Sequence, residues 1–496
     1  MKRFIEDELN RWKAAPLRMP LLIRGARQVG KSFVIEKFGK ENFTHIVTIN
    51  FEFKPVLKDC FRDLDPKKIV RDIELALKVQ IQPGTTLLFL DEIQFCPEAI
   101  VSLRYFKELM GDLHVIAAGS LLEFALVDKD LSFPVGRVQS IYMRPLSFLE
   151  FLEVMDEGQL IQFILTFEWG TEIGQAVHER LMELVKIYFF VGGMPGAIAK
   201  YLATDSLQDC QNYLMALIDL YRADMAKYAT KTQYRHLQTL FDRAPESVGL
   251  RFKYSFIDPD AKSRDLRTAL DQLTWAGLFN PVLATSAGGM PLQAQVKSKV
   301  QKLLYLDIGM LQTSLKVDPL LFFREDLTLI HAGALAEQFV GQELIAYANP
   351  YDLMQLHFWE REKTGSAAEV DYILSLGSDI IPVEVKAGSL GKLRSINVFL
   401  EEKKSPFGIR ICGSILRGVD FFRFDRVKAS GIEDLEEGHI SQYCPLRDLQ
   451  SARAFTQVKT KKINAPQYKP KKSRPIITIP FYLVSQLQRL CISHFK

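Results

Sequence analysis

One short segment near the amino end constrains the fold of this chain more than any other. It joins a β-rich apolar run, Leu21 to Arg24, to an amphipathic run, Phe33 to Phe38. The joining residues are Gly25, Ala26, Arg27, Gln28, Val29, Gly30, Lys31 and Ser32. In such a loop, glycines let backbone N–H groups curl round phosphates, a lysine neutralises charge and a hydroxyl ligates Mg²⁺. All of these residues are therefore predicted to form a phosphate-binding loop (P-loop) for Mg²⁺ and a nucleoside triphosphate, which we expect to be ATP.

Two acidic residues follow a buried strand further along the chain. The apolar run Thr86 to Leu90 ends at Asp91 and Glu92. Parallel α/β sheets bind ligands at the carboxyl ends of their strands, so both carboxylates are expected beside the P-loop. We predict that Asp91 and Ser32 hold the Mg²⁺ of the nucleotide. Glu92 is predicted to deprotonate the attacking water, with Lys31 as the catalytic cation.

Ser120 and Arg137 are further candidates for catalysis. The predicted strand Val115 to Ala118 leads to Ser120, which either hydrogen-bonds the γ-phosphate or attacking water, or caps the next helix. Arg137 is a candidate arginine finger, a cation that meets the charge of the transition state. A lone arginine in a loop is more often an ion-pairing surface residue. Both interpretations stay open for each residue.

The order of predicted elements divides the chain into four parts. Short buried strands alternate with helices up to about residue 150, which indicates a parallel sheet covered on both faces. Residues 151–240 show helical periodicity interrupted at 191–195, and residues 241–330 show a helix followed by two strands. Residues 331–496 form a second α/β unit with a basic linker at 459–475. We therefore predict an α/β fold with domains at 1–150, 151–240, 241–330 and 331–496.

Individual elements are predicted within these parts. The strands of the first part are Leu21 to Arg24, Ile46 to Phe51, Thr86 to Leu90 and Val115 to Ala118. In the third part, a helix from Ser263 to Ala276 carries Leu266, Ala269, Leu270 and Leu273 on one face. The last part begins with a helix from Gly333 to Ala348, followed by strands at Leu356 to Trp359, Val370 to Leu374, Ile380 to Val385 and Ile476 to Val484.

The motifs also carry a family resemblance. Four segments resemble a prokaryotic group of AAA-type P-loop ATPases: Arg24 to Ser32, Leu88 to Ile93, Ala117 to Ser120 and Arg144 to Phe148. In that group a C-terminal region of unknown function follows the ATPase, and three segments are similar to it: Lys302 to Gly309, Glu369 to Ile373 and Pro382 to Gly388. The resemblance implies an AAA-type ATPase, but it supplies no substrate. The helical periodicity of residues 151–240 predicts a helical lid.

A second group of ionic residues is expected in the last domain. A hairpin with its turn at 377–378 sets Asp371 opposite Glu384, with Lys386 on the same face as Glu384. A divalent cation would relieve the repulsion between the carboxylates. The arrangement resembles the PD-(D/E)xK (restriction-endonuclease-like) nuclease fold, which implies Mg²⁺ ligands at Asp371, Glu384 and Glu337, with Lys386 supporting the water nucleophile. DNA cleavage, a non-cleaving remnant and a solvated Glu–Lys pair all stay open.

Basic residues suggest a nucleic-acid partner. Lys262, Arg264 and Arg267 stand near the start of the helix Ser263 to Ala276, which resembles the recognition helix of a winged-helix module. The run 459–475 is the densest in lysine, although such runs are commonly linkers. An ordinary solvated face explains the helix equally well, so DNA contact stays open.

Charge, cysteine spacing and hydropathy argue against several other classes of protein. A net charge of +4 over 496 residues does not by itself imply nucleic-acid binding. The six cysteines are far apart and form no Cys-x-x-Cys pair, which argues against a zinc ribbon or a disulfide framework and fits a reducing compartment. The chain shows no signal peptide and no apolar run long enough to span a membrane. We expect a cytoplasmic protein without a membrane partner.

The leading hypothesis is a Mg²⁺-dependent AAA-type ATPase that couples hydrolysis to a nucleic-acid-directed C-terminal domain. The alternative is a non-catalytic, nucleotide-dependent switch that binds a protein partner. The oligomeric state stays open.

Overall fold

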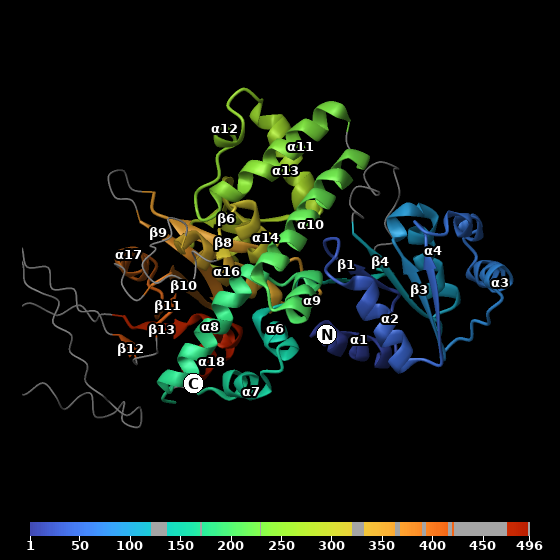
Figure 1. The fold of residues 1–496 in the computed structure, drawn as a ribbon, viewed down its shortest axis with the longest axis horizontal. Helices are drawn as coiled ribbons and strands as arrows, with labels where there is room; N and C mark the ends of the chain where they lie inside the picture. The colour runs from blue at the N-terminus through green and yellow to red at the C-terminus, as the bar shows by residue number, and fades with distance from the viewer. Residues whose placement is uncertain are drawn as a thin grey trace, which may run out of the picture. The chain divides into compact units, whose positions relative to one another are not determined.

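The chain forms two compact units, each assembled from segments that are separate in sequence. Figure 1 labels the helices and strands of the chain. The computed structural model describes residues 1–120, 136–168, 171–228, 230–319, 332–362, 368–388, 393–414, 419–420 and 474–494. The first unit contains Met1–Ile161, Glu183–Ala284 and Val296–His357, and the second contains Gln162–Met182, Thr285–Gln295 and Phe358–Lys496. Every residue predicted to bind ATP lies in the first unit. The division into four domains stays a prediction.

The amino-terminal part is built on a parallel sheet. Its strands are β1 Leu21–Arg24, β2 His45–Asn50, β3 Thr86–Asp91, β4 His114–Gly119 and β5 Gln139–Tyr142. Among the described residues their order is β2-β3-β4-β1-β5, and every pairing between them is parallel. β3 and β4 are buried along their whole length, which explains their continuous apolar sequences. The four predicted strands are thus confirmed.

The strand β5 was not predicted. It pairs in parallel with β1, but Ile141 is its one buried side chain. A strand with so few apolar residues has no periodic signal in the sequence. The chain leaves β5 at Met143, whose carbonyl oxygen lies close to Gly25 of the P-loop.

Helices cover both faces of this sheet, as predicted. They are α1 Ile5–Ala14, α2 Lys31–Asn42, α3 Pro66–Leu77 and α4 Pro97–Leu109. The face bearing Leu88 and Leu90 shares a buried core with α3 and α4. The other face bears Leu87 and packs on α2 at Gly39, where a Cβ atom would lie 2.4 Å from Ile46. A larger residue there would displace the end of the Ile46 side chain, so the glycine lets the helix pack closely on the sheet.

A helical segment follows the parallel sheet. It contains α6 Phe148–Val154, α7 Gly158–Thr166, α8 Gln175–Val191, α9 Pro195–Thr204, α10 Leu207–Tyr228 and α11 Lys231–Arg243. A capping box between Ser147 and Glu150 begins α6. The break predicted at 191–195 is confirmed, because α8 ends at Val191 and α9 begins at Pro195.

The next segment begins with helices and continues into strands. Its elements are α12 Tyr254–Ile257, α13 Ser263–Trp275, β6 Phe279–Thr285, β7 Val296–Tyr305, α14 Ile308–Ser314 and α16 Ala332–Ala346. The predicted amphipathic helix is confirmed as α13, with its four predicted apolar residues buried. The long helix predicted from Gly333 is confirmed as α16.

The C-terminal strands belong to a mixed sheet. They are β8 Leu356–Glu360, β9 Glu369–Leu376, β10 Asp379–Lys386, β11 Gly408–Cys412, β12 Val419–Asp420 and β13 Ile476–Pro480, with helices α17 Arg394–Lys403 and α18 Leu487–His494. The strand order is β12-β13-β11-β10-β9-β8-β6-β7. β9 and β10 pair antiparallel, whereas β10 and β11 pair parallel.

Two predicted segments of this sheet differ in the structure from a simple reading of the sequence. The two strands predicted in residues 241–330 are β6 and β7, and they form one end of the larger sheet. The strand predicted from Ile476 to Val484 ends at Pro480, and a 3-10 helix, Phe481–Gln486, follows it. A short buried apolar run has no period that separates a strand from a helix.

Among the described residues, no single helix is long and apolar enough to span a membrane. The pair α8 and α9, which is bent by 117°, has the length and composition of a broken membrane span. Cys60, Cys96, Cys210, Cys412 and Cys491 carry free thiols. Cys444 and most of the predicted basic linker, 459–473, lie outside the described residues.

Candidate functional site

Three strand ends meet at one edge of the parallel sheet. β4 lies between β1 and β3, with Gly119 of β4 level with Arg24 of β1 and Ala117 level with Leu90 of β3. Residues that follow these strands therefore lie close together, at the edge where such sheets bind ligands. The structure thus brings together the P-loop, Asp91, Glu92 and Ser120.

Two glycines shape the P-loop. Gly25 has a φ of 150°, and a Cβ atom there would lie 2.2 Å from the carbonyl oxygen of Met143, so no side chain fits. Gly30 has a φ of 95° and is the N-cap of α2, which begins at Lys31. The loop therefore turns directly into a helix N-terminus, whose unpaired N–H groups and dipole favour an anion.

Lys31 is buried and folded back onto the P-loop. Its Nζ donates hydrogen bonds to the carbonyl oxygens of Gly25 at 2.9 Å and Ala26 at 2.8 Å. Burial lowers the pKa of Lys31 to about 8, opposed by the attraction of Glu92 and Asp91. A phosphate would offer this ammonium group charged acceptors, which make stronger hydrogen bonds than neutral carbonyls.

The Asp91 carboxylate accepts hydrogen bonds from Ser32 at the start of α2 and from Asn50 at the end of β2. The hydroxyl of Ser32 lies 2.9 and 3.0 Å from its two carboxylate oxygens. The Asn50 amide donates to Oδ2 at 3.0 Å. Burial raises the pKa of Asp91, while the hydrogen bond from Ser32 opposes that change. A hydroxyl and a carboxylate are oxygen ligands of the type that Mg²⁺ prefers, so this pair fits the predicted ion.

Glu92 adopts an uncommon backbone conformation. Its φ of 50° and ψ of 46° are left-handed, and such values in residues other than glycine are frequent at functional sites. Its carboxylate accepts a hydrogen bond from Nε2 of Gln94 at 2.5 Å. Gln94 is buried and packs against Gly119, where a Cβ atom would lie 2.8 Å from its Oε1.

Arg27 connects the P-loop with α10. Its Nε donates to Oγ of Ser120 at 3.2 Å, and its guanidinium forms an ion pair with Asp224. The hydroxyl of Tyr221 donates to the carbonyl oxygen of Arg27 at 2.6 Å. The sequence did not predict roles for Tyr221 or Asp224, or for Asn50 and Gln94.

Arg137 lies away from the P-loop within this chain. It precedes β5, whose first residue, Gln139, pairs with Leu21 at the start of β1, whereas the P-loop follows the end of β1. Its Nε donates to Oε1 of Glu108 in α4 at 3.0 Å, and its side chain is 49% exposed. The structure thus shows Arg137 in an ion pair. Within one chain Arg137 does not reach the P-loop, so the arginine-finger role stays a prediction.

The predicted ionic hairpin forms between β9 and β10. The pairing runs from Asp379–Leu376 to Val383–Tyr372, which is the predicted register. Glu384 and Asp371 are the next residues along the two strands. Nζ of Lys386 lies 2.5 Å from Oε1 of Glu384. Oδ2 of Asp371 accepts a hydrogen bond from the Val385 amide at 2.8 Å.

Glu337 forms a buried ion pair. It is buried in α16, and its Oε1 lies 2.9 Å from Nζ of Lys302 on β7, so the two form an ion pair within the first unit. Across the described ranges, no group of three or more His, Cys, Asp or Glu residues is arranged to hold a metal ion. The nuclease-like metal site therefore stays a prediction. At the start of α13, the side chains of Lys262, Arg264 and Arg267 are exposed.

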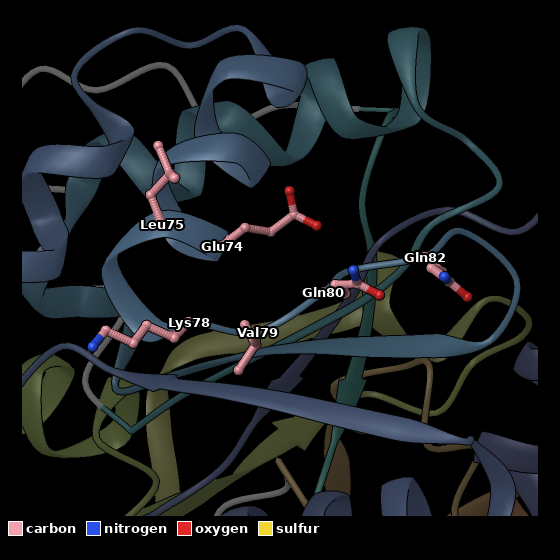
Figure 2. Close-up of a pocket in the computed structure, with 6 residues that line it drawn as sticks. All are labelled: Glu74, Leu75, Lys78, Val79, Gln80 and Gln82. Carbon is pink, nitrogen blue, oxygen red and sulfur yellow. The ribbon is translucent and has the colours of Figure 1, made fainter.

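An open hollow lies where α3 ends, away from the predicted site. Figure 2 shows its lining residues, which are Glu74, Leu75, Lys78, Val79, Gln80 and Gln82. The Glu74 carboxylate already accepts a hydrogen bond from the Ile81 amide at 2.8 Å. No residue predicted to act in binding or catalysis lines the hollow.

Three consecutive segments match known protein families. Residues 17–152 match an AAA domain, residues 182–321 match a domain of unknown function (DUF8612), and residues 332–425 match another (DUF4143). No curated protein matches the chain significantly.

Several solved structures are similar to parts of the chain. The Aeropyrum pernix ORC2 protein in its ADPNP–ADP complexes is 13% identical, with a TM-score of 0.31 over 64% of this chain and 94% of that one. The A. pernix ORC1 protein in complex with DNA is 12% identical, with a TM-score of 0.25 over 65% and 94%. AMPPCP-bound DnaA from Aquifex aeolicus is 14% identical, with a TM-score of 0.27 over 55% and 89%. Similarities this distant carry no argument about function.

The family match and the parallel sheet agree on the amino-terminal part of the chain. That part has an AAA-type P-loop ATPase fold, followed by two domains of unknown function.

Proposed function

We propose that the protein is an AAA-type ATPase that binds ATP with Mg²⁺ and hydrolyses it. The observation that carries this proposal is the contact between Ser32 and Asp91. The Ser32 hydroxyl, at the start of α2, lies 2.9 and 3.0 Å from the carboxylate oxygens of Asp91, at the end of β3. These two groups, beside the buried ammonium of Lys31, are what a magnesium polyphosphate requires.

Each residue of the site has a role in the proposed reaction. Bound Mg²⁺ supplies positive charge at the phosphate oxygens. Lys31 moves its hydrogen bonds from the loop carbonyls to phosphate oxygens, and the P-loop amides hold the same phosphates. Glu92 orients the attacking water and accepts its proton, with Gln94 fixing the direction of the carboxylate. Ser120 supplies a hydroxyl at the same edge of the sheet.

Phosphate release from ATP by the full chain tests the proposal. We expect turnover with Mg²⁺ and none when a chelator removes the ion. Lys31→Ala should abolish turnover, because it removes the cation that meets the phosphates. Lys40→Ala is the matched control, since Lys40 is exposed on the same helix. A wild-type chain that shows no affinity for Mg·ATP in calorimetry would refute the proposal.

We further propose that hydrolysis is coupled to a nucleic acid through the C-terminal half. Support comes from the exposed Arg264 and Arg267 at the start of α13, and from the Glu384–Lys386 pair beside Asp371. Cations that contact phosphates make affinity strongly salt-dependent.

Duplex DNA affinity measured across salt concentrations tests this coupling. Removing one phosphate-contacting arginine should lower the salt slope by about 1. We therefore expect a smaller slope for Arg264→Ala and Arg267→Ala, and an unchanged slope for Lys67→Ala, an exposed lysine on α3. DNA that neither binds nor stimulates ATP turnover would contradict the coupling.

A second candidate is a nucleotide-dependent switch that does not turn over and that binds a protein partner. One observation favours it: protein groups already engage both Lys31 and Glu92, through the carbonyl oxygen of Gly25 and the amide of Gln94. A single-turnover experiment separates the two functions. If wild type binds Mg·ATP but hydrolyses it no faster than Glu92→Gln, with or without DNA, the switch is the better account.

A further inference from the structure

One P-loop side chain reaches both the phosphate edge and the helical segment. The guanidinium of Arg27 contacts Ser120 through Nε at 3.2 Å and pairs with Asp224 on α10 through its NH1 nitrogen. Arg27 and Asp224 are both largely buried, with side-chain exposures of 14% and 7%. A guanidinium has a rigid fork of donors, so its position is set by the groups it bonds.

The guanidinium lies on the side of the site where water activation is proposed. Ser120 directly follows Gly119, which packs against Gln94. Gln94 in turn donates to the carboxylate of Glu92, the proposed acceptor of the water proton. The water attacks the terminal phosphate, so the end of the nucleotide expected nearest to Arg27 is the γ-phosphate.

The charges around the P-loop support an anion between its two cations. The positive charge of Arg27 adds to burial in lowering the pKa of Lys31, so the two cations repel each other. A phosphate oxygen bound between them would convert this repulsion into two attractions. The carboxylate of Asp224 and a phosphate would then compete for the same guanidinium.

We propose that Arg27 is a second phosphate-contacting cation of the P-loop, and that the γ-phosphate draws it away from Asp224, so that the terminal phosphate of ATP loosens α10. This inference rests on the proposed function, because it requires Mg·ATP at the P-loop.

A second contact limits how far α10 can loosen. The hydroxyl of Tyr221 donates to the backbone carbonyl oxygen of Arg27 at 2.6 Å. Tyr221 stands three residues before Asp224, on the same face of the helix. This bond uses the backbone of Arg27, so movement of the guanidinium toward a phosphate does not break it. Opening of the ion pair therefore leaves α10 attached by Tyr221, and the expected change is local.

Calorimetry with Mg·ATPγS and Mg·ADP tests the phosphate contact. A hydrogen bond to a charged group contributes about 1.5–3 kcal/mol, so Arg27→Ala should weaken Mg·ATPγS binding roughly tenfold or more while leaving Mg·ADP nearly unchanged. Asp224→Asn removes the competing charge and should tighten Mg·ATPγS binding several-fold. The double variant should match Arg27→Ala alone. Asp219→Asn is the matched control, since Asp219 is an exposed carboxylate of the same helix that pairs with Arg222.

Hydrogen exchange in peptides from α10 tests the coupling. In wild type, amides of α10 near Asp224 should exchange faster with Mg·ATPγS bound than with Mg·ADP bound. Asp224→Asn should show the fast pattern with either nucleotide, and Asp219→Asn should behave like wild type. Equal exchange with the two nucleotides in wild type would overturn the coupling.

The outcomes separate this inference from the proposed function. Wild type that binds neither nucleotide overturns both. Wild type that binds both nucleotides, with an ATPγS-to-ADP affinity ratio that Arg27→Ala does not change, overturns only the role of Arg27. If Arg27→Ala does not fold, the affinity ratio of Asp224→Asn decides, because an unchanged ratio there also overturns the role.

Discussion

The P-loop edge and the β9–β10 hairpin both contain carboxylates beside a lysine, but they assemble these groups differently. At the P-loop edge, Lys31 and Asp91 come from separate strand–helix connections and are brought together by the parallel sheet. In the hairpin, Glu384 and Lys386 stand two residues apart on one strand and pair with each other at 2.5 Å. Charged groups from distant segments meet at the sheet edge where a ligand can bind them all. Charged neighbours on one strand face can instead pair with each other and leave no charge for a ligand to balance.

The largest expected effect compares Glu92 with Glu384. General base catalysis contributes about 10²–10⁴-fold to a rate, so Glu92→Gln should slow ATP turnover by that factor while nucleotide affinity persists. Glu384→Gln should leave ATP turnover unchanged, because Glu384 pairs with Lys386 within the hairpin. Steady-state phosphate release, with calorimetry for binding, checks both variants. Equal loss of turnover in the two would erase the contrast between the sites.

The next effect compares the two lysines. A charge-assisted hydrogen bond to phosphate contributes about 1.5–3 kcal/mol, so Lys31→Ala should weaken Mg·ATP binding by roughly 10–100-fold. Lys386→Ala should leave that affinity unchanged. It removes an ion-pair partner of the buried Glu384 carboxylate, so it should lower thermal stability. Calorimetry and thermal melting of both variants check these outcomes. Wild-type affinity in Lys31→Ala would remove the lysine from the phosphate site.

The sequence predicts the P-loop edge well because its signals are local. The glycines, Lys31 and Ser32 follow a strand directly, and Asp91 and Glu92 end another. Once the sheet is parallel, all of these residues must lie at its carboxyl edge. The same reasoning predicts the hairpin register, because a tight turn fixes which residues of two adjacent strands oppose each other.

The partners of these residues could not be predicted in the same way. Asn50 and Gln94 are single polar residues near strand ends, and Asp224 is one of several acidic residues on a long helix. What distinguishes them is the distant segment that each one contacts, and no local pattern records such a contact. The same limit explains β5 and the membership of β6 and β7 in the larger sheet, since strand pairing depends on residues far apart in the chain.

Nucleotide affinity should also fall in alkaline solution. The pKa of Lys31 is lowered to about 8, so its ammonium group is half deprotonated near pH 8 and is progressively lost above it. Mg·ATP binding requires the ammonium, so the dissociation constant should rise above pH 8 by up to about tenfold per pH unit. Lys31→Arg stays charged over this range and should give a flat profile. A wild-type profile that is flat from pH 8 to 10 would contradict this role.

The smallest expected effect decides what Asp371 does in the hairpin. Its Oδ2 accepts a hydrogen bond from the Val385 amide at 2.8 Å, so as a structural brace it should slow hydrogen exchange in β10. A hydrogen bond worth about 1 kcal/mol changes exchange roughly fivefold. Asp371→Ala should then speed exchange in β10 by that factor, while Asp371→Asn, whose side-chain oxygen still accepts, should change it little. Asp379→Ala, at the exposed end of the hairpin, is the control.

If Asp371 is instead a metal ligand, the pattern should be the opposite. Added Mg²⁺ would slow hydrogen exchange in wild type, and both Asp371 variants would lose that protection equally, since an amide is a far weaker ligand for Mg²⁺ than a carboxylate.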